Sequence, residues 1–225
     1  MSDKTKKILI NCFMVLLTIV GLALIFNEQI KSFIVDHMQE SALEQPIKKH
    51  PKKGQFDAGK VGEVTPEDVA RAAMKEPSDA IGKISIPAVG LRLPIFYGMA
   101  TNNMMRGACT MRPNEQMGMQ GNYTLAGHHM MDSQILFGPL QKVRDGNLIY
   151  LTDGKKVYTY KTVITDVVSE YQTVWLNNVP NAKVITLITC ASGHTGETRR
   201  IVIRGQLQNV QKVNAKNLKL FAAYH

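Results

Sequence analysis

Residues 147–164 read NLIYLTDGKKVYTYKTVI, and this stretch carries the strongest hairpin signal in the chain. Two runs of β-branched and aromatic residues flank Asp153-Gly154, a dipeptide that favours tight turns between antiparallel strands. Large side chains alternate with others on both sides of the turn, which is typical of half-buried strands. The alternating residues are Leu148, Tyr150, Tyr158 and Tyr160. The stretch therefore predicts a β-hairpin.

Runs of the same kind continue on both sides of the hairpin, from about residue 82 to residue 207. They read KISIP (83–87), LRLPIFY (91–97), NYTLAG (122–127), VITLIT (184–189) and RIVIRGQL (200–207). Several short strands separated by turn residues predict an all-β barrel or sandwich. We expect one helix to interrupt these strands, over residues 133–143.

An uncharged apolar run, ILINCFMVLLTIVGLALIF, occupies residues 8–26. At 1.5 Å per residue its length matches the bilayer's hydrocarbon core of about 30 Å, which predicts a transmembrane helix. Lysines precede the run and charges of both signs follow it, so residues 1–7 are expected in the cytoplasm and the rest outside. A cleaved signal peptide is the alternative, but its apolar core is shorter and a small-x-small cleavage site is missing here.

A juxtamembrane helix and a linker are expected over residues 27–64. Apolar residues at helical spacing predict the helix over residues 28–43. The next stretch, residues 44–63, is rich in Lys, Pro and Gly with few large apolar side chains, so we expect a spacer without packed structure.

A short helix is expected at the start of the globular part. Thr65 and Pro66 are the residue types of a helix cap and of a first helical position, and the helix should run to about Lys75. One extracellular domain is expected over residues 65–225, a length that fits a single core.

The net charge of +9 does not indicate a nucleic-acid-binding protein, because the lysines cluster in the amino-terminal tail and in the linker. The three cysteines, Cys12, Cys109 and Cys190, cannot all pair, and Cys12 lies in the apolar run. A disulfide framework of the small secreted type is therefore excluded.

Cys190 is the candidate nucleophile. It directly follows the strand-like run 184–189 and precedes the small, polar stretch 191–196, so its thiol is expected at the end of a strand beside a loop. A buried and inert thiol is the alternative reading. A reactive thiol needs a base or a cation within reach.

Candidate bases are three of the six histidines. His37, His50 and His225 lie in the juxtamembrane helix, the linker and the terminus, where no shaped site is expected. His194 lies in a glycine-flanked loop, and with Cys190 it offers only two of the four ligands that structural zinc requires, so no zinc site is expected.

His128 and His129 end the strand-like run 122–127. Ala126 and Gly127, which precede them, leave the backbone open to close approach by a substrate. The candidate cation is Arg200 at the start of the run 200–207, because a guanidinium can hold a carbonyl and its developing oxyanion. Strand alternation places Arg199 on the opposite face.

Two motifs resemble a known family. Thr186-Leu-Ile-Thr-Cys190 matches the TLxTC signature of the sortases, and Leu125-Ala-Gly-His128 matches their histidine motif. The likeness extends over roughly residues 82–207 and points to class A sortases. It implies a mainly β fold: a closed eight-stranded barrel with a few short helices, preceded by a transmembrane helix, with Cys190, His128 and Arg200 at one groove.

The resemblance also implies a function. A class A sortase is a cysteine transpeptidase that cleaves the carboxy-terminal LPxTG-type sorting signal of secreted surface proteins between Thr and Gly. It forms a thioacyl enzyme at Cys190 and transfers the acyl group to an amine of the peptidoglycan precursor, which anchors the protein to a Gram-positive cell wall. Ala126 and Thr189 are expected at the substrate site, and the Thr189 hydroxyl is a candidate to bind either substrate or backbone.

No cofactor or metal is expected. Some class A sortases bind calcium through an acidic cluster, whereas residues 111–117 here offer one carboxylate, that of Glu115. A hard cation wants several oxygen ligands. Two other functions stay open from the residues alone: a membrane-anchored cysteine protease with water as acceptor, and a tethered binding module with an unreactive Cys190.

Overall fold

The structure is a computed structural model that describes residues 3–48 and 53–223. Three pieces of the expectations above lie outside the described residues. These are residues 1–2 of the expected cytoplasmic tail, residues 49–52 of the expected linker, including His50, and residues 224–225, including His225.

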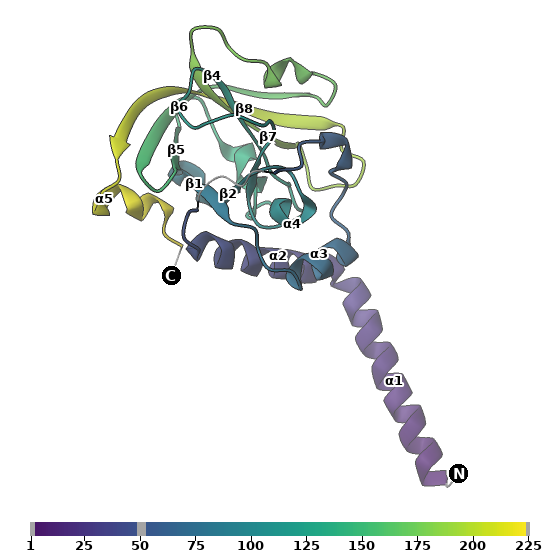
Figure 1. Ribbon diagram of the computed structural model, residues 1–225. Coiled ribbons are helices and arrows are strands. Elements are labelled where there is room, and N and C mark those ends of the chain that lie inside the picture. Colours follow the sequence, from purple (N-terminus) through teal and green to yellow (C-terminus); the bar gives the residue numbers. More distant parts are fainter. Residues whose placement is uncertain (1–2, 49–52, 224–225) are drawn as a thin grey trace.

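Eight strands close into one barrel in the order β1-β2-β3-β4-β7-β8-β6-β5 (Figure 1). The strands are β1 (Ala80–Ile86), β2 (Leu91–Phe96), β3 (Ala108–Thr110), β4 (Gly121–Ala126), β5 (Leu148–Thr152), β6 (Lys156–Ser169), β7 (Lys183–Cys190) and β8 (Arg199–Lys212). The closed eight-stranded barrel is confirmed, and each strand has a neighbouring strand on both sides.

The hairpin predicted from residues 147–164 is formed by β5 and β6, which pair antiparallel. Gly154 has a φ of 82°, a conformation that glycine adopts without steric cost. The Asp153 carboxylate accepts hydrogen bonds from the backbone N–H groups of Lys155 (2.8 Å) and Lys156 (2.7 Å). The hydrogen bonds that form the turn join residues close in the sequence, which is why the turn can be predicted from the sequence.

Alternate residues of each strand fill the barrel. On β7, Ile185 and Leu187 are fully buried inside it, and Ile203 of β8 lies among them. Burying one such side chain stabilises the fold by about 1.5–3 kcal/mol. Because side chains alternate along a strand, Thr186, Ile188 and Cys190 must then face outward from the barrel.

Helix α1 (Asp3–Ile25) projects away from the barrel, and α2 (Asn27–Glu44) and α3 (Pro66–Ala73) lie along the side where it joins (Figure 1). Two shorter helices are α4 (Thr101–Met104) and α5 (Ala215–Leu218), and the 3-10 turns are η1 (Ala58–Lys60), η2 (Pro87–Val89), η3 (Gly138–Lys142), η4 (Thr173–Leu176) and η5 (Lys219–Phe221). By length and composition α1 can cross a membrane, and none of its residues is buried.

The short helix expected after Thr65 is present as α3. The Thr65 hydroxyl accepts a hydrogen bond from the Asp68 backbone N–H (3.1 Å), and Pro66 occupies the first helical turn. The helix expected over residues 133–143 is wrong, because only η3 forms there. Leu136 has a φ of 50°, which breaks a right-handed helix, and its N–H donates instead to the side chain of Gln39 in α2.

The linker also differs from the expectation, because its described part packs on the barrel. The Gln55 carbonyl accepts a hydrogen bond from the Met99 N–H (2.6 Å). The Phe56 ring meets the Tyr97 ring edge to face, with centroids 4.9 Å apart. Gly98 has no side chain to block this approach, since a Cβ there would lie 2.7 Å from the Gln55 nitrogen. A few specific contacts thus order a stretch that is poor in apolar residues.

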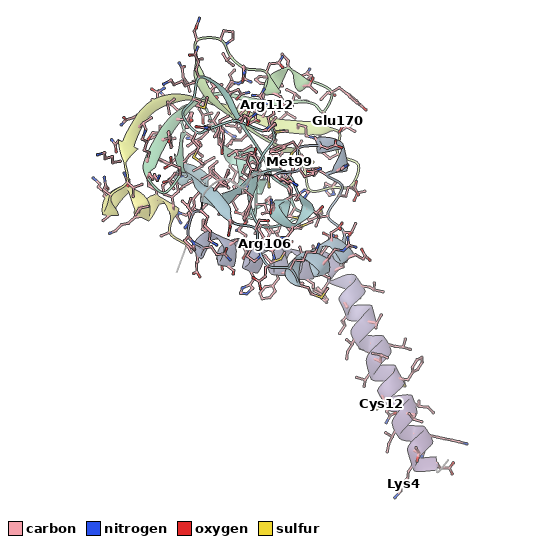
Figure 2. All side chains as sticks on the ribbon, viewed as in Figure 1. Lys4, Cys12, Met99, Arg106, Arg112 and Glu170 are labelled. Atoms are coloured by element: carbon pink, nitrogen blue, oxygen red, sulfur yellow. The ribbon has the colours of Figure 1, made fainter. Side chains whose placement is uncertain are left out.

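Arg106 joins α3 to the barrel (Figure 2). Its guanidinium is almost fully buried and donates to the carbonyls of Ala72 (2.7 Å) and Lys75 (2.8 Å) at the end of α3. It also donates to the Asn102 carbonyl (3.0 Å). Carbonyls at the end of a helix lack their regular partners. Arg106 provides a charged donor to the Lys75 carbonyl and adds one to the Ala72 carbonyl, which also accepts from the Lys75 N–H (3.1 Å).

We expect Arg106→Gln to lower the free energy of unfolding by about 2 kcal/mol or more, because buried carbonyls would lose charged donors. The measurement is urea unfolding of the detergent-solubilised chain. The matched control is Arg71→Gln on α3, whose exposed ion pair with Asp68 at 3.8 Å should contribute less than about 0.5 kcal/mol. Equal effects of the two substitutions would contradict this account of Arg106.

Candidate active site

The floor of a groove is formed by β4, β7 and β8. In the ladder between β7 and β8, Cys190 is the direct partner of Arg200, and Ile188 is the partner of Val202. Ala126 of β4 is the partner of Ile188 on the other side. All five side chains line a groove of about 1020 Å³. Strand register therefore brings Ala126 and Arg200, which are 74 positions apart in the sequence, to the same floor.

The walls of the groove come from segments outside the strands. They are residues 128–131 after β4, residues 170–176 after β6, residues 192–198 after β7, and residues 61–64 of the linker. A hydrogen bond joins the linker to the segment after β7, because the Gly196 N–H donates to the Glu63 carboxylate (2.8 Å). The linker is thus part of the site.

Cys190 is the last residue of β7, and its side chain is partly exposed to the groove. Burial raises the pKa of the Cys190 thiol above its ordinary value, and the carboxylates of Glu197, Glu170 and Glu63 act in the same direction. The Arg200 guanidinium opposes them and lowers the pKa of the thiol. At neutral pH the resting group is therefore the protonated thiol.

His128 follows β4 and Gly127. Burial lowers the pKa of His128 to about 4, against the opposing charge of Asp68, so the ring is a neutral imidazole at neutral pH. The backbone around it is held on both sides. The His128 carbonyl accepts from the Phe137 N–H (2.9 Å), and the Gly127 carbonyl accepts from the Thr189 hydroxyl (2.8 Å).

Arg200 is half-buried and donates to the Glu170 carboxylate (2.6 Å), which Figure 2 shows at the rim of the barrel. One of its terminal nitrogens also donates to the carbonyls of Glu197 (2.7 Å) and Arg199 (3.0 Å). Arg199 is largely exposed, pairs with the Glu197 carboxylate (3.1 Å), and does not line the groove. The two arginines therefore take opposite faces, as strand alternation predicts.

The two expected substrate-site residues occupy different positions. Ala126 lines the groove floor. Thr189 also borders the groove, but it is buried, and its hydroxyl donates to the Gly127 carbonyl (2.8 Å), so in this structure the hydroxyl is bonded to the backbone. Through that bond Thr189 ties the strand that carries Cys190 to the segment that carries His128.

His129, one of the three candidate bases, lies 2.8 Å from the Cys190 carbonyl through Nδ1, which must carry the proton of that bond. Two groove residues were not expected from the sequence. Glu170 and Glu63 reach the groove from the end of β6 and from the linker. No local pattern marks the two glutamates, because their position depends on how loops fold over the barrel.

Metal ligands are sparse in the described part of the chain, which contains no group of three or more His, Cys, Asp or Glu side chains placed to hold an ion. The Glu115 carboxylate is already engaged. It accepts from Arg112 Nε (2.6 Å) and from both the backbone N–H and the hydroxyl of Thr124 (2.8 Å each). Cys109 is fully buried, and burial raises the pKa of its thiol, in keeping with a packing role.

Comparison with known proteins agrees with this architecture. A family described as the sortase domain matches residues 84–208. The chain is 39% identical to sortase A of Listeria monocytogenes over 206 residues, which cover 88% of this chain and 91% of the relative. It is 36% identical to sortase A of Streptococcus agalactiae over 222 residues, 93% of this chain and 89% of the relative.

A solved structure shows the same fold. The crystal structure of Listeria monocytogenes sortase A superposes with a TM-score of 0.61 at 40% identity and covers 64% of this chain and 99% of that one. The barrel, the TLxTC strand and these matches agree, and the chain belongs to the sortase family of cysteine transpeptidases.

Proposed function

We propose that this sortase cleaves an LPxTG-type sorting signal between Thr and Gly and transfers the new carboxyl end to an amine of the peptidoglycan precursor. The observation that carries the proposal is the pairing of Cys190 with Arg200 at one end of a groove whose floor continues along β7 and β8. Helix α1 would anchor the enzyme with residues 1–7 in the cytoplasm and residues 65–225 outside, beyond the juxtamembrane helix and linker of residues 27–64.

The floor suits a short extended peptide. On β7 and β8 it runs from the Cys190–Arg200 pair to the Ile188–Val202 pair, about 7 Å at the rise of a β-strand, and Trp175 and Leu176 of the loop after β6 line the groove as well. Four residues of an extended substrate, from Leu to Thr of the signal, are about 13 Å long, so the signal would reach past the strands to the loop wall. Apolar side chains of Ala126, Ile188 and Val202 line the middle of this path.

Cys190 acts as the nucleophile. Before the reaction, the Cys190 thiol is protonated and the His128 ring is neutral. The thiol proton passes to His128 as the sulfur attacks the Thr carbonyl carbon. A tetrahedral oxyanion results, with a new C–S bond. When it collapses, the C–N bond to Gly breaks and the His128 imidazolium gives its proton to the leaving amine. The Thr acyl group stays on sulfur as a thioester.

Arg200 stabilises the oxyanion. A guanidinium has five N–H donors, and the contacts among the described residues use two on one terminal nitrogen and one on the other. One terminal N–H and the Nε–H then remain for the substrate oxygen. The Glu170 bond orients the group without consuming these donors, so Glu170 is a positioning residue in this proposal.

The second half of the reaction reverses the proton transfer. An acceptor amine attacks the thioester carbon, and neutral His128 takes the amine's proton. Collapse of the second oxyanion breaks the C–S bond, and His128 returns the proton to Cys190. The product is an amide between the surface protein and the acceptor. Water in place of the amine would give hydrolysis, so the acceptor decides between transpeptidase and protease.

We expect the detergent-solubilised chain to join an LPxTG peptide to an amine acceptor, with a thioacyl intermediate on Cys190. Mass spectrometry of the products and of the protein is the measurement. Cys190→Ala should lose both product and adduct, while Cys109→Ala, which changes a buried thiol outside the groove, should retain them. Cleavage by water alone at every acceptor concentration would instead identify a protease.

We expect Arg200→Gln to shift the alkylation of Cys190 by iodoacetamide to higher pH. Only the thiolate reacts, and Arg200 is the group that lowers the thiol pKa against burial and three carboxylates. Removing the cation raises that pKa, so the reaction at any given pH below it becomes slower. Arg199→Gln is the matched control on the same strand. A shift of equal size in the control would contradict this role of Arg200.

We expect His128→Asn to reduce kcat/KM for transfer by about 10²–10⁴-fold, the usual contribution of general acid-base catalysis. In His129→Asn the new amide can still donate to the Cys190 carbonyl, so kcat/KM should stay within about tenfold of wild type, or about 1.4 kcal/mol. Steady-state kinetics on both variants is the measurement. The reverse order of effects would move the proton-transfer role to His129.

A further inference from the structure

Arg204 lies on the same face of β8 as Arg200, with Val202 between them. Its ladder partner is Thr186, just as the partner of Arg200 is Cys190. Arg204 does not line the groove itself; it lies two residues beyond Val202 on β8, against the loop that carries Trp175. The proton-transfer steps do not use it, and burial lowers the pKa of its guanidinium, which nonetheless stays charged at neutral pH.

Arg204 is bonded to the loop that follows β6. Its Nη2 donates to the Trp175 carbonyl (2.8 Å), and its guanidinium carbon lies over the Trp175 ring, 4.8 Å from the centroid. Its Nε donates to the Thr186 hydroxyl (3.2 Å). One side chain thus combines a hydrogen bond, a cation–π contact and an anchor to the neighbouring strand.

Asn122 of β4 completes the network. Its amide nitrogen donates to the carbonyls of Trp175 (2.9 Å) and Asn177 (3.1 Å), and its amide oxygen accepts from the Thr186 hydroxyl (2.8 Å). Thr186 is fully buried beneath these contacts. Side chains from β4, β7 and β8 therefore converge on the backbone of residues 175–177. Such a network is rigid only while each member keeps its partners.

The segment held in this way forms one wall of the groove. Tyr171, Thr173, Trp175 and Leu176 line the groove. The segment has little apolar anchoring, since the side chain of Tyr171 is 82% exposed and that of Val174 is 63% exposed. Loops with few buried apolar contacts open easily, so the polar network has a large influence on the position of this wall.

We propose that Arg204 is a positioning residue for the donor peptide. It holds Trp175, and with it the wall at the far end of the groove, in the position that receives the amino-terminal residues of the sorting signal. Arg204 acts on peptide binding and selectivity through Trp175, and leaves the chemistry at Cys190 unchanged. The inference rests on the proposed function, because it assumes that the sorting signal lies along the floor from Cys190 toward Thr186.

The test uses the full chain in detergent, with Arg204→Gln, Arg204→Lys and the matched control Arg144→Gln. Arg144 is an exposed arginine that donates to the carbonyls of Gln141 and Val143 and does not line the groove. Trp175 is the one tryptophan in the sequence, so intrinsic fluorescence reports this wall directly. Thermal unfolding of each variant separates loss of fold from loss of position.

For Arg204→Gln we expect red-shifted emission and stronger acrylamide quenching of Trp175 in the peptide-free protein. KM for the LPxTG peptide should rise about tenfold, which corresponds to about 1.4 kcal/mol, while kcat and the alkylation rate of Cys190 stay at the wild-type values. Arg204→Lys keeps the charge and a donor, so it should recover part of both effects. Arg144→Gln should match wild type in every measurement.

Several outcomes would overturn the proposal. Unchanged quenching in Arg204→Gln would show that Trp175 is held without Arg204. A fall in kcat with constant KM would place the effect at the chemistry. Unfolding of both Arg204 variants at the assay temperature would assign the residue to the stability of the barrel. If wild-type protein fails to process the peptide, the proposed function fails, and the fluorescence comparison still decides whether Arg204 holds Trp175.

Discussion

The pairing of β7 with β8 is the constraint on which the rest of the structure depends. Because Ile185, Leu187 and Ile203 must be buried inside the barrel, the residues between them must face outward. A register slip of one residue would turn the Cys190 thiol into the core and turn Leu187 out to the surface. The same apolar packing that stabilises the barrel therefore fixes which thiol meets which guanidinium, and no separate device is needed to align them.

The groove sets two opposing demands on its charges. Partial burial favours the neutral thiol and the neutral imidazole, which protects Cys190 from adventitious reaction at rest. The proposed mechanism requires the thiolate and the imidazolium transiently, and the Arg200 cation lowers the pKa of the thiol. Glu170 limits that effect while it orients Arg200. Reactivity is thus a balance among one cation, three carboxylates and desolvation, and each can be changed by a single substitution.

Most of the barrel was predictable from the sequence, because its signals are local. Asp153-Gly154 marks its hairpin through turn chemistry, and Thr65 marks its helix through a capping bond three residues away. The helix expected over residues 133–143 failed for a tertiary reason, since Gln39 of α2 takes the Leu136 N–H in a conformation that excludes a helix. At the site, motif likeness predicts Cys190 and His128 as catalytic residues, whereas Glu63 and Glu170 come from distant segments that carry no recognisable sequence pattern.

The division between floor and walls explains why the linker and the loop after β6 depend on polar contacts. The floor consists of strands that share a ladder of hydrogen bonds and a large apolar core, so it is rigid without further support. The walls have few buried apolar side chains, and polar contacts hold them in place, such as the bond from Gly196 to Glu63 and the network of Arg204 and Asn122 around Trp175. Substitutions in these contacts can therefore change the position of the walls while Cys190 and Arg200 stay fixed, which in the proposed function would separate substrate recognition from chemistry within one barrel.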